Sequence, residues 1–230
     1  MKPLLQSQPG TANPAWNCWG NDQKLLALYQ KRCRQAVEEM TCARQAAQIL
    51  QPICQPGDTL LDVGCGGGYY YHSFLNRNIP IEYYGLDYTP QMIALAQQEM
   101  SLLSHRFILG HIEDLIHSFD HILCFNVLTY APHYAQCLER LLRCAKKTLL
   151  IRESLYNNLI IRYQPDPYID TDKVGMRAYA NTYPQKEVIH LIESEGFEVS
   201  PIVDERTQNK PEMVIDIPHY WKILLATRKI

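Results

Sequence analysis

The sequence predicts an α/β fold in three layers, with a mostly parallel sheet between two layers of helices. After Pro56-Gly57, short apolar runs of strand length alternate with helical patterns, as is typical of parallel strands that helices connect. Hydrophobic residues make up 47% of the 230 residues, which is enough to bury the core of one such domain.

The strand-like runs after Pro56-Gly57 define the sheet. They span residues 59–63, 81–87, 106–110, 119–127 and 147–154. Helical patterns lie between them, at residues 69–77, from Thr89 onward and from Pro132 onward. Thr89 is suited to cap its helix because Pro90 follows it at the first helical position. Each pair of neighbouring strands can therefore be parallel.

Two segments outside this alternation of strands and helices are expected to cover the core domain. Apolar residues at intervals of three and four predict one long helix over residues 22–50, which Asn21 or Asp22 caps. We expect residues 1–50 to be an N-terminal segment and helix that cover residues 51–230 as a lid or cap. Within that domain, residues 155–183 form a lid-like insertion, since loops of this length are uncommon unless functional. Three aromatic residues of the N-terminal segment, Trp16, Trp19 and Tyr29, can join this insertion in a lid over the mouth of the site.

The last third of the chain returns to regular structure. Pro184 opens a helix that Gly196 ends. Two strands follow, at residues 197–206 and 219–229, and the short connection between them favours an antiparallel pair.

Composition and charge exclude several classes of protein. The chain has 22 basic and 24 acidic residues and no block of like charge, which argues against a nucleic-acid binder. No apolar run has the length of a signal peptide or a membrane span, so we expect a soluble, cytoplasmic protein without a membrane partner. Eight cysteines without a C-x-x-C pair predict reduced structural thiols and no metal site. The sequence sets no oligomeric state.

A glycine-rich turn, LLDVGCGGGYYYH, follows the first strand. Four of the five residues from Gly64 to Gly68 are glycine, which allows positive φ angles and a close approach of a ligand to the main chain. The turn predicts a nucleotide-like cofactor at the start of the next helix. In the dinucleotide fingerprint G-x-G-x-x-G, however, Tyr69 or Tyr71 would replace the third glycine, so an NAD-dependent oxidoreductase is only an alternative.

The same turn resembles motif I of the class I S-adenosylmethionine-dependent methyltransferases, D/E-x-G-x-G-x-G. Gly64, Gly66 and Gly68 fill the glycine positions, and Asp62 is the leading acid. Three segments that resemble later motifs follow in order: YYGLDYTPQMI, LGHIEDL and FNVLTYAP. The resemblance covers about residues 40–151 well and the last two strands more loosely. It implies a three-layer Rossmann-like sandwich with a mostly parallel sheet of seven strands, in which the last strand of the chain is antiparallel.

The resemblance also implies a cofactor, S-adenosylmethionine, and roles for particular residues. Asp87 would bind both ribose hydroxyls, and its place nineteen positions after Gly68 fits the ~20 of a βαβ unit. Ile112 would pack on the adenine, where His111 departs from the acid that many relatives carry. The full expected cofactor-binding set is Asp62, Gly64, Gly66, Gly68, Tyr69, Asp87, Tyr88, Met92, Ile112, Glu113 and Asn126.

Each of these roles has a structural alternative. Asp87 could serve only as an N-cap for the helix that begins at Thr89. The tyrosines after the glycine turn could simply pack against the sheet. His111 and Tyr88 could face solvent.

Methyl transfer from a sulfonium is an in-line displacement, so the protein mainly supplies position and alignment. A base is needed only if the acceptor arrives protonated, and we expect His133 or Tyr130, which follow the fourth strand, to be the catalytic residue. Arg152 and Glu153 could bind the acceptor or pair with each other. The expected function is O- or N-methylation of a small or medium organic molecule; a non-catalytic cofactor-binding protein is a further alternative.

Overall fold

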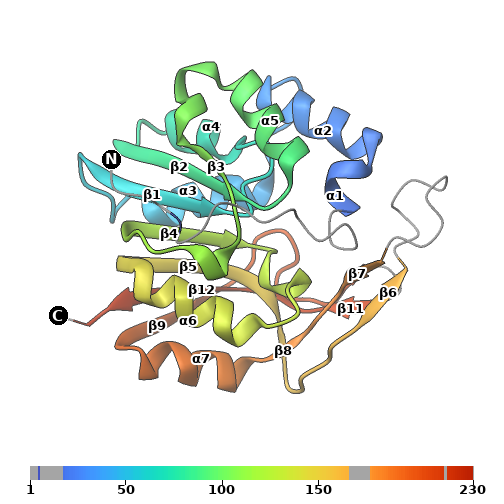
Figure 1. Cartoon of the computed structure of the whole chain (residues 1–230). Helices are drawn as coiled ribbons and strands as arrows, with labels where there is room; N and C mark the ends of the chain where they lie inside the picture. Colours follow the sequence, from blue (N-terminus) through green and yellow to red (C-terminus); the bar gives the residue numbers. More distant parts are fainter. Residues whose placement is uncertain (1–4, 6–17, 166–176, 215–216, 230) are drawn as a thin grey trace.

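Seven strands form the central sheet in the order β3-β2-β1-β4-β5-β12-β9 (Figure 1). This computed structural model describes residues 5, 18–165, 177–214 and 217–229. The strands are β1 (Asp58–Val63), β2 (Ile81–Asp87), β3 (Phe107–Leu109), β4 (Phe119–Phe125), β5 (Ala145–Tyr156), β9 (Phe197–Ile202) and β12 (Trp221–Arg228). The first five are parallel, and β12 is antiparallel to both neighbours, as predicted. A two-residue strand, β8 (Tyr183–Pro184), also pairs with the end of β5.

Helices cover both faces of the sheet, which confirms the three-layer prediction. They are α1 (Cys18–Asn21), α2 (Gln23–Cys33), α3 (Thr41–Leu50), α4 (Tyr70–Leu75), α5 (Pro90–Glu99), α6 (Tyr134–Cys144) and α7 (Gln185–Ser194). Successive strand residues point to opposite faces, so Leu60 packs with α3, α4 and α5 while Leu61 packs with α6 and α7. Both leucines are fully buried, as the apolar run of β1 requires.

Three short 3₁₀ helices lie at strand ends: η1 (Ser101–Arg106), η2 (Ile112–Asp114) and η3 (Leu128–Tyr130). The predicted start of α5 is confirmed, with Thr89 at the N-cap position and Pro90 as the first helical residue. Gly196 follows α7 with a φ of 86°, a conformation that glycine adopts without strain.

The prediction of one helix over residues 22–50 was wrong. Asp22 does cap α2 and accepts hydrogen bonds from two backbone N–H groups. The chain then leaves the helix over residues 34–40, where Gln35 has a φ of 52°. No glycine or proline marks this break. Contacts with α4 and the turn after it fix the break instead, because Arg77 pairs with Glu39 and His72 bonds the carbonyl of Cys33.

The segment 155–183, expected to be a lid-like insertion, begins as a continuation of β5, which extends to Tyr156. Two strands, β6 (Tyr163–Pro165) and β7 (Arg177–Tyr179), then pair antiparallel. Another antiparallel pair, β10 (Glu212–Val214) with β11 (Ile217–His219), lies between the last two sheet strands and was not predicted. The predicted strands at 197–206 and 219–229 are shorter in the structure.

Two findings concern the residues that the structure describes. None of their helices has the length and apolarity that a bilayer span requires. Their seven cysteines with described side chains are free, buried thiols.

Candidate functional site

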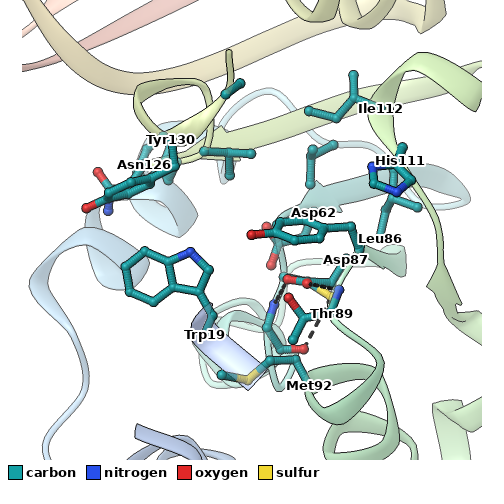
Figure 2. Close-up of a pocket in the computed structure, with 18 of the residues that line it drawn as sticks. Trp19, Asp62, Leu86, Asp87, Thr89, Met92, His111, Ile112, Asn126 and Tyr130 are labelled. Atoms are coloured by element: carbon teal, nitrogen blue, oxygen red, sulfur yellow. Dashed lines mark hydrogen bonds between the residues drawn. The ribbon is translucent and has the colours of Figure 1, made fainter. Parts of the chain in front are cut away.

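A cavity of about 270 Å³ opens at the carboxyl ends of β1, β2 and β4. All of the expected site residues except Gly68 and His133 line it. Figure 2 shows His111 and Ile112 at one end, Asp87 in the middle, and Trp19 with Tyr130 at the other end. Parallel strands place their carboxyl ends on one edge, which explains why segments far apart in sequence meet here.

The glycine turn after β1 forms one wall of the cavity. Gly64, Gly66 and Gly68 all have positive φ angles, from 53° to 75°. A Cβ atom on Gly68 would lie 2.3 Å from the ring of Phe107, so this glycine serves packing and does not face the cavity. A Cβ atom on Gly66 would similarly lie 2.4 Å from the ring of Tyr29.

Asp87 ends β2 and is 8% exposed. Its carboxylate accepts hydrogen bonds from the backbone N–H groups of Gly66, at 2.9 Å, and Thr89, at 2.8 Å (Figure 2). Burial raises the pKa of this carboxyl, against the effect of these two bonds. A carboxylate offers about four acceptor positions, so Asp87 retains capacity for a ligand beyond its structural role.

Asp62 lies beside Asp87 on the neighbouring strand and is also buried. It accepts a hydrogen bond from the hydroxyl of Tyr83. Burial, opposed by the bond from Tyr83 and assisted by the charge of Asp87, raises the pKa of Asp62 to about 7. The cavity thus has two neighbouring acids whose protonation depends on what binds there.

The end of the cavity near β3 is apolar and aromatic. Ile112 is buried at the start of η2, and Met92 is buried in α5. The rings of Tyr88 and His111 stack with an interplanar angle of 20° and centroids 5.8 Å apart. His111 therefore lines the cavity rather than facing solvent alone. Glu113 lies at the edge, exposed, with Cys137 donating to it at 3.4 Å.

The opposite end, which we call the aromatic end, consists of Trp19, Asn126, Val127, Tyr130, Ala131 and Pro132. The rings of Trp19 and Tyr130 meet edge to face, with centroids 5.0 Å apart. Asn126 has a φ of 58° and accepts a hydrogen bond from Arg152. Among the lining residues that the structure describes, no charged side chain belongs to the aromatic end. His133 lies just beyond it, exposed at the N-cap of α6 and outside the cavity lining.

Arg152 and Glu153 neither line the cavity, where they could bind an acceptor, nor pair with each other. Arg152 is buried and binds both carboxylate oxygens of Asp204, at 2.8 and 2.9 Å. Glu153 accepts three backbone N–H bonds and the Thr129 hydroxyl bond, all from residues 127–129. Burial raises the pKa of Glu153 to about 7 despite these bonds. The two side chains shape the turn after β4 from behind and do not line the cavity.

The sequence did not single out Arg32 and Met40, which also line the cavity. The Arg32 guanidinium lies over the rings of Tyr29, at 5.4 Å, and Tyr69, at 5.2 Å. Tyr29 was expected in the N-terminal lid, and Arg32 follows it on the same helix face, three residues later. That spacing from Tyr29 was the sequence signal that could have placed Arg32 at the site. Trp16, which was also expected in the lid, lies outside the described residues.

Comparison with known proteins identifies the family. Residues 55–207 match the model of a methyltransferase domain. No curated protein matches the sequence. The fold is similar to that of magnesium protoporphyrin IX methyltransferase from Synechocystis, solved with S-adenosylhomocysteine bound (18% identity, 82% of each chain, TM-score 0.57).

Two further solved structures share the fold. One is an S-adenosylmethionine-dependent methyltransferase from Clostridium acetobutylicum, at 13% identity, 90% coverage of this chain and 98% of that one, and a TM-score of 0.58. The other is the cyclase SpnF, at 17% identity, 83% and 82% coverage, and a TM-score of 0.57. This chain belongs to the methyltransferase-domain family, and the predicted class I methyltransferase with S-adenosylmethionine as its cofactor is confirmed.

Proposed function

We propose that this enzyme transfers the methyl group of S-adenosylmethionine to an oxygen or nitrogen of a small or medium organic acceptor. The observation that carries the proposal is the division of the cavity into two chemically different ends. The part of the cavity from the apolar end near β3 to the acids Asp62 and Asp87 in the middle has the lining that a nucleoside with an amino-acid tail requires. The aromatic end is uncharged, and it suits an organic acceptor with apolar surface.

The residues of the first end fit the cofactor. Asp87 has acceptor capacity left for the ribose hydroxyls, and Gly64 and Gly66 line the cavity while the missing Cβ atoms leave room for Val127 and Tyr29. Gly68 maintains the turn. We assign the amino end of the methionine part to Asp62 and its edge to Tyr69. The adenine side comprises Tyr88, Met92, Ile112 and Glu113.

S-adenosylmethionine supplies a methyl group that is already activated by the sulfonium charge. The chain's task is to align the acceptor with the methyl–sulfur bond and to exclude water. The rings of Tyr69 and Tyr70 line the cavity, and an aromatic face attracts a cation by roughly 0.5–2 kcal/mol. We also assign Asn126, which directly follows β4 and belongs to the aromatic end, to the binding of the cofactor.

We propose Tyr130 as the residue that contacts the acceptor, because its ring forms part of the aromatic end. His133 is a less direct candidate, since its side chain is exposed outside the lining. An amine that arrives neutral needs no base, whereas a phenol, with an ordinary pKa of about 10, arrives protonated and needs one. The insertion at 155–183 would border this end, because Asn181 donates to the carbonyl of Ala131.

We also propose that the protein is cytoplasmic and that its partner is a small molecule and not a nucleic acid.

A methyl-transfer assay with isotopically labelled S-adenosylmethionine tests this proposal. Phenols, aromatic amines and aliphatic amines are offered as acceptors. We expect transfer to aromatic acceptors, and we expect Tyr130→Phe and Trp19→Ala to raise KM for the acceptor while S-adenosylhomocysteine still binds. Cofactor binding without transfer to any organic acceptor, together with transfer to a nucleic acid or protein, would contradict the proposed acceptor class.

A further inference from the structure

Asn126 is a polar residue of the aromatic end whose side chain has a fixed orientation. It directly follows β4, is half-buried and lines the cavity. Arg152, in β5 behind the cavity, holds it at two points. The Arg152 carbonyl accepts a hydrogen bond from the Asn126 backbone N–H at 2.8 Å, and the Arg152 guanidinium donates to the Asn126 side-chain oxygen.

The second bond decides which end of the Asn126 amide faces the cavity. A guanidinium has five N–H donors and no acceptor, so the atom that faces Arg152 must be the amide oxygen. The amide nitrogen then points away from Arg152, which is fully buried. Among the described residues nothing accepts from this nitrogen, and it is not one of the inaccessible polar atoms without a partner. Asn126 therefore presents N–H donors to the cavity.

Arg152 is itself held in place. Asp204 binds two of its nitrogen atoms, at 2.8 and 2.9 Å, and the centroid of the Trp221 ring lies 4.7 Å from its guanidinium carbon. A flipped Asn126 amide would place its N–H groups against those of a buried guanidinium and leave both without an acceptor, which is costly. The pair of Arg152 and Asp204 thus keeps Asn126 as a preorganised donor.

A fixed donor at this place distinguishes two kinds of acceptor molecule. An oxygen nucleophile has lone pairs besides the one that attacks the methyl group, and these accept N–H bonds. A neutral amine has a single lone pair, which the attack uses, and its own N–H groups would face those of Asn126. Hydrogen bonds to the charged form of an acid favour that form, so the same donor lowers the pKa of a bound phenol. Asn126 therefore favours a phenolate.

The charges around Asn126 are compatible with an anion at the aromatic end. Arg152 and Asp204 neutralise each other, and Glu153 is bonded by four donors of the turn after β4. Asp62 and Asp87 lie in the middle of the cavity (Figure 2). The other charged or basic side chains of the described lining, all outside the aromatic end, are Arg32, His111 and Glu113. The sulfonium of the cofactor must adjoin the acceptor, and its positive charge attracts an anionic nucleophile.

We propose that the acceptor is a phenol or another acidic hydroxyl compound, which the N–H groups of Asn126 bind as its anion, and that Arg152 and Asp204 are positioning residues for this donor. The phenol releases its proton to water. Its oxygen then bonds to the methyl carbon while the carbon–sulfur bond breaks and leaves its electron pair on sulfur, giving a methyl ether and S-adenosylhomocysteine. This inference rests on the proposed function. Because the amide nitrogen has two N–H groups, Asn126 can serve the cofactor as well.

Spectrophotometric titration of 4-nitrophenol, whose anion is coloured, tests the donor without methyl transfer. The whole chain is saturated with S-adenosylhomocysteine, and the ionised fraction of bound 4-nitrophenol is followed against pH. We expect the pKa of the bound compound to lie about one pH unit below its value in water, and this effect to be lost in Asn126→Asp, because a carboxylate only accepts. An unaltered pKa in the original protein, an equal effect in Asn126→Asp, or no binding of 4-nitrophenol would overturn the proposal.

Asn78→Asp is the matched control. Asn78 is also an asparagine in the left-handed region, with a φ of 51° against 58° for Asn126. It is exposed in the turn after α4 and does not line the cavity. The substitution adds the same negative charge, and the lowered pKa of 4-nitrophenol should persist. Its loss in Asn78→Asp would mean that added charge, and not a missing donor, explains the first result.

The ratio of kcat/KM for phenol to that for aniline tests the positioning role of Arg152. Arg152→Gln replaces a pure donor with a group that also accepts, so the Asn126 amide can turn, whereas Arg152→Lys remains a pure donor. We expect the ratio to fall about ten-fold in Arg152→Gln and to change little in Arg152→Lys, although both variants lose stability. Equal ratios in the two variants would mean that Arg152 has only a structural role.

Failure of this inference is distinguishable from failure of the proposed function. Methyl transfer to aniline with none to phenol would overturn the inference and leave the proposed function intact. Transfer to no organic acceptor would refute the proposed function. In that case a lowered pKa of bound 4-nitrophenol that Asn126→Asp abolishes would still support Asn126 as the donor to a phenolate.

Discussion

Two buried carboxylates at neighbouring strand ends determine the chemistry of the site at the scale of single residues. Asp87 already holds the glycine turn and the start of α5, and Asp62 is paired with the hydroxyl of Tyr83. Each also lines the cavity. A structural role and a binding role are therefore not alternatives here, because a carboxylate has enough acceptor positions for both.

Asp87→Ala should weaken the binding of S-adenosylhomocysteine by one to two orders of magnitude. The substitution leaves the ribose hydroxyls and the N–H group of Gly66 without an acceptor, and each unpaired group costs about 1–3 kcal/mol. Calorimetry measures the affinity. Asp120→Ala is the matched control, since Asp120 makes comparable bonds to Thr59 at the opposite end of the sheet. Unchanged affinity in Asp87→Ala would place the ribose elsewhere.

The raised pKa of Asp62, about 7, predicts a pH dependence of cofactor binding. The amino end of the cofactor favours the ionised carboxylate, so binding lowers this pKa and releases a proton. Affinity should therefore rise between about pH 6 and pH 8 and level off above the pKa of the free protein. Titrations at several pH values measure this slope. Asp62→Asn should bind more weakly and lose this contribution to the slope, and an unaltered slope would assign the pH dependence to another group.

At the scale of elements, β5 supports the site from behind. Arg152 connects this strand to Asp204 and to Asn126, and it packs over the ring of Trp221 at 4.7 Å. Glu153 anchors the turn after β4. The aromatic end is therefore built on a strand whose charged residues never reach the cavity.

Arg152→Met should destabilise the protein by about 3–5 kcal/mol, because Asp204 would remain buried without its partner. The free energy of unfolding in urea measures this change. Arg44→Met is the control: Arg44 pairs with the adjacent Glu205 at the surface, where an ion pair contributes at most about 1 kcal/mol. Similar losses in the two variants would mean that burial does not set the strength of the Arg152 pair.

The sequence predicted the elements whose signals are local. Thr89-Pro90, Pro184 and Gly196 mark helix ends, and the central strands are apolar runs long enough to be recognised. The break between α2 and α3 has no such signal. It depends on Arg77 and His72, which lie more than thirty residues further along the chain. Contacts of this kind cannot be inferred from periodicity alone.

At the scale of the whole molecule, the parallel pairing of the central strands and the antiparallel β12 followed from the resemblance and the alternation of elements, whereas the order of the strands in the sheet was not predicted. Most of the expected site residues line one cavity, because they occupy carboxyl ends of parallel strands. Arg32 and Met40 escaped prediction because they belong to the N-terminal segment, whose position depends on tertiary contacts. The pairing of Arg152 with Asp204, 52 residues later, was hidden for the same reason.

Calorimetric titration of the purified protein with S-adenosylmethionine, S-adenosylhomocysteine and NAD tests the central claim, that the cavity at the strand ends is the cofactor site. We expect micromolar binding of the first two compounds, no binding of NAD, and weakened binding of both active ligands in Asp87→Ala. Binding of NAD alone would contradict the account of the cofactor. Full binding of S-adenosylmethionine in Asp87→Ala would contradict its assignment to this cavity.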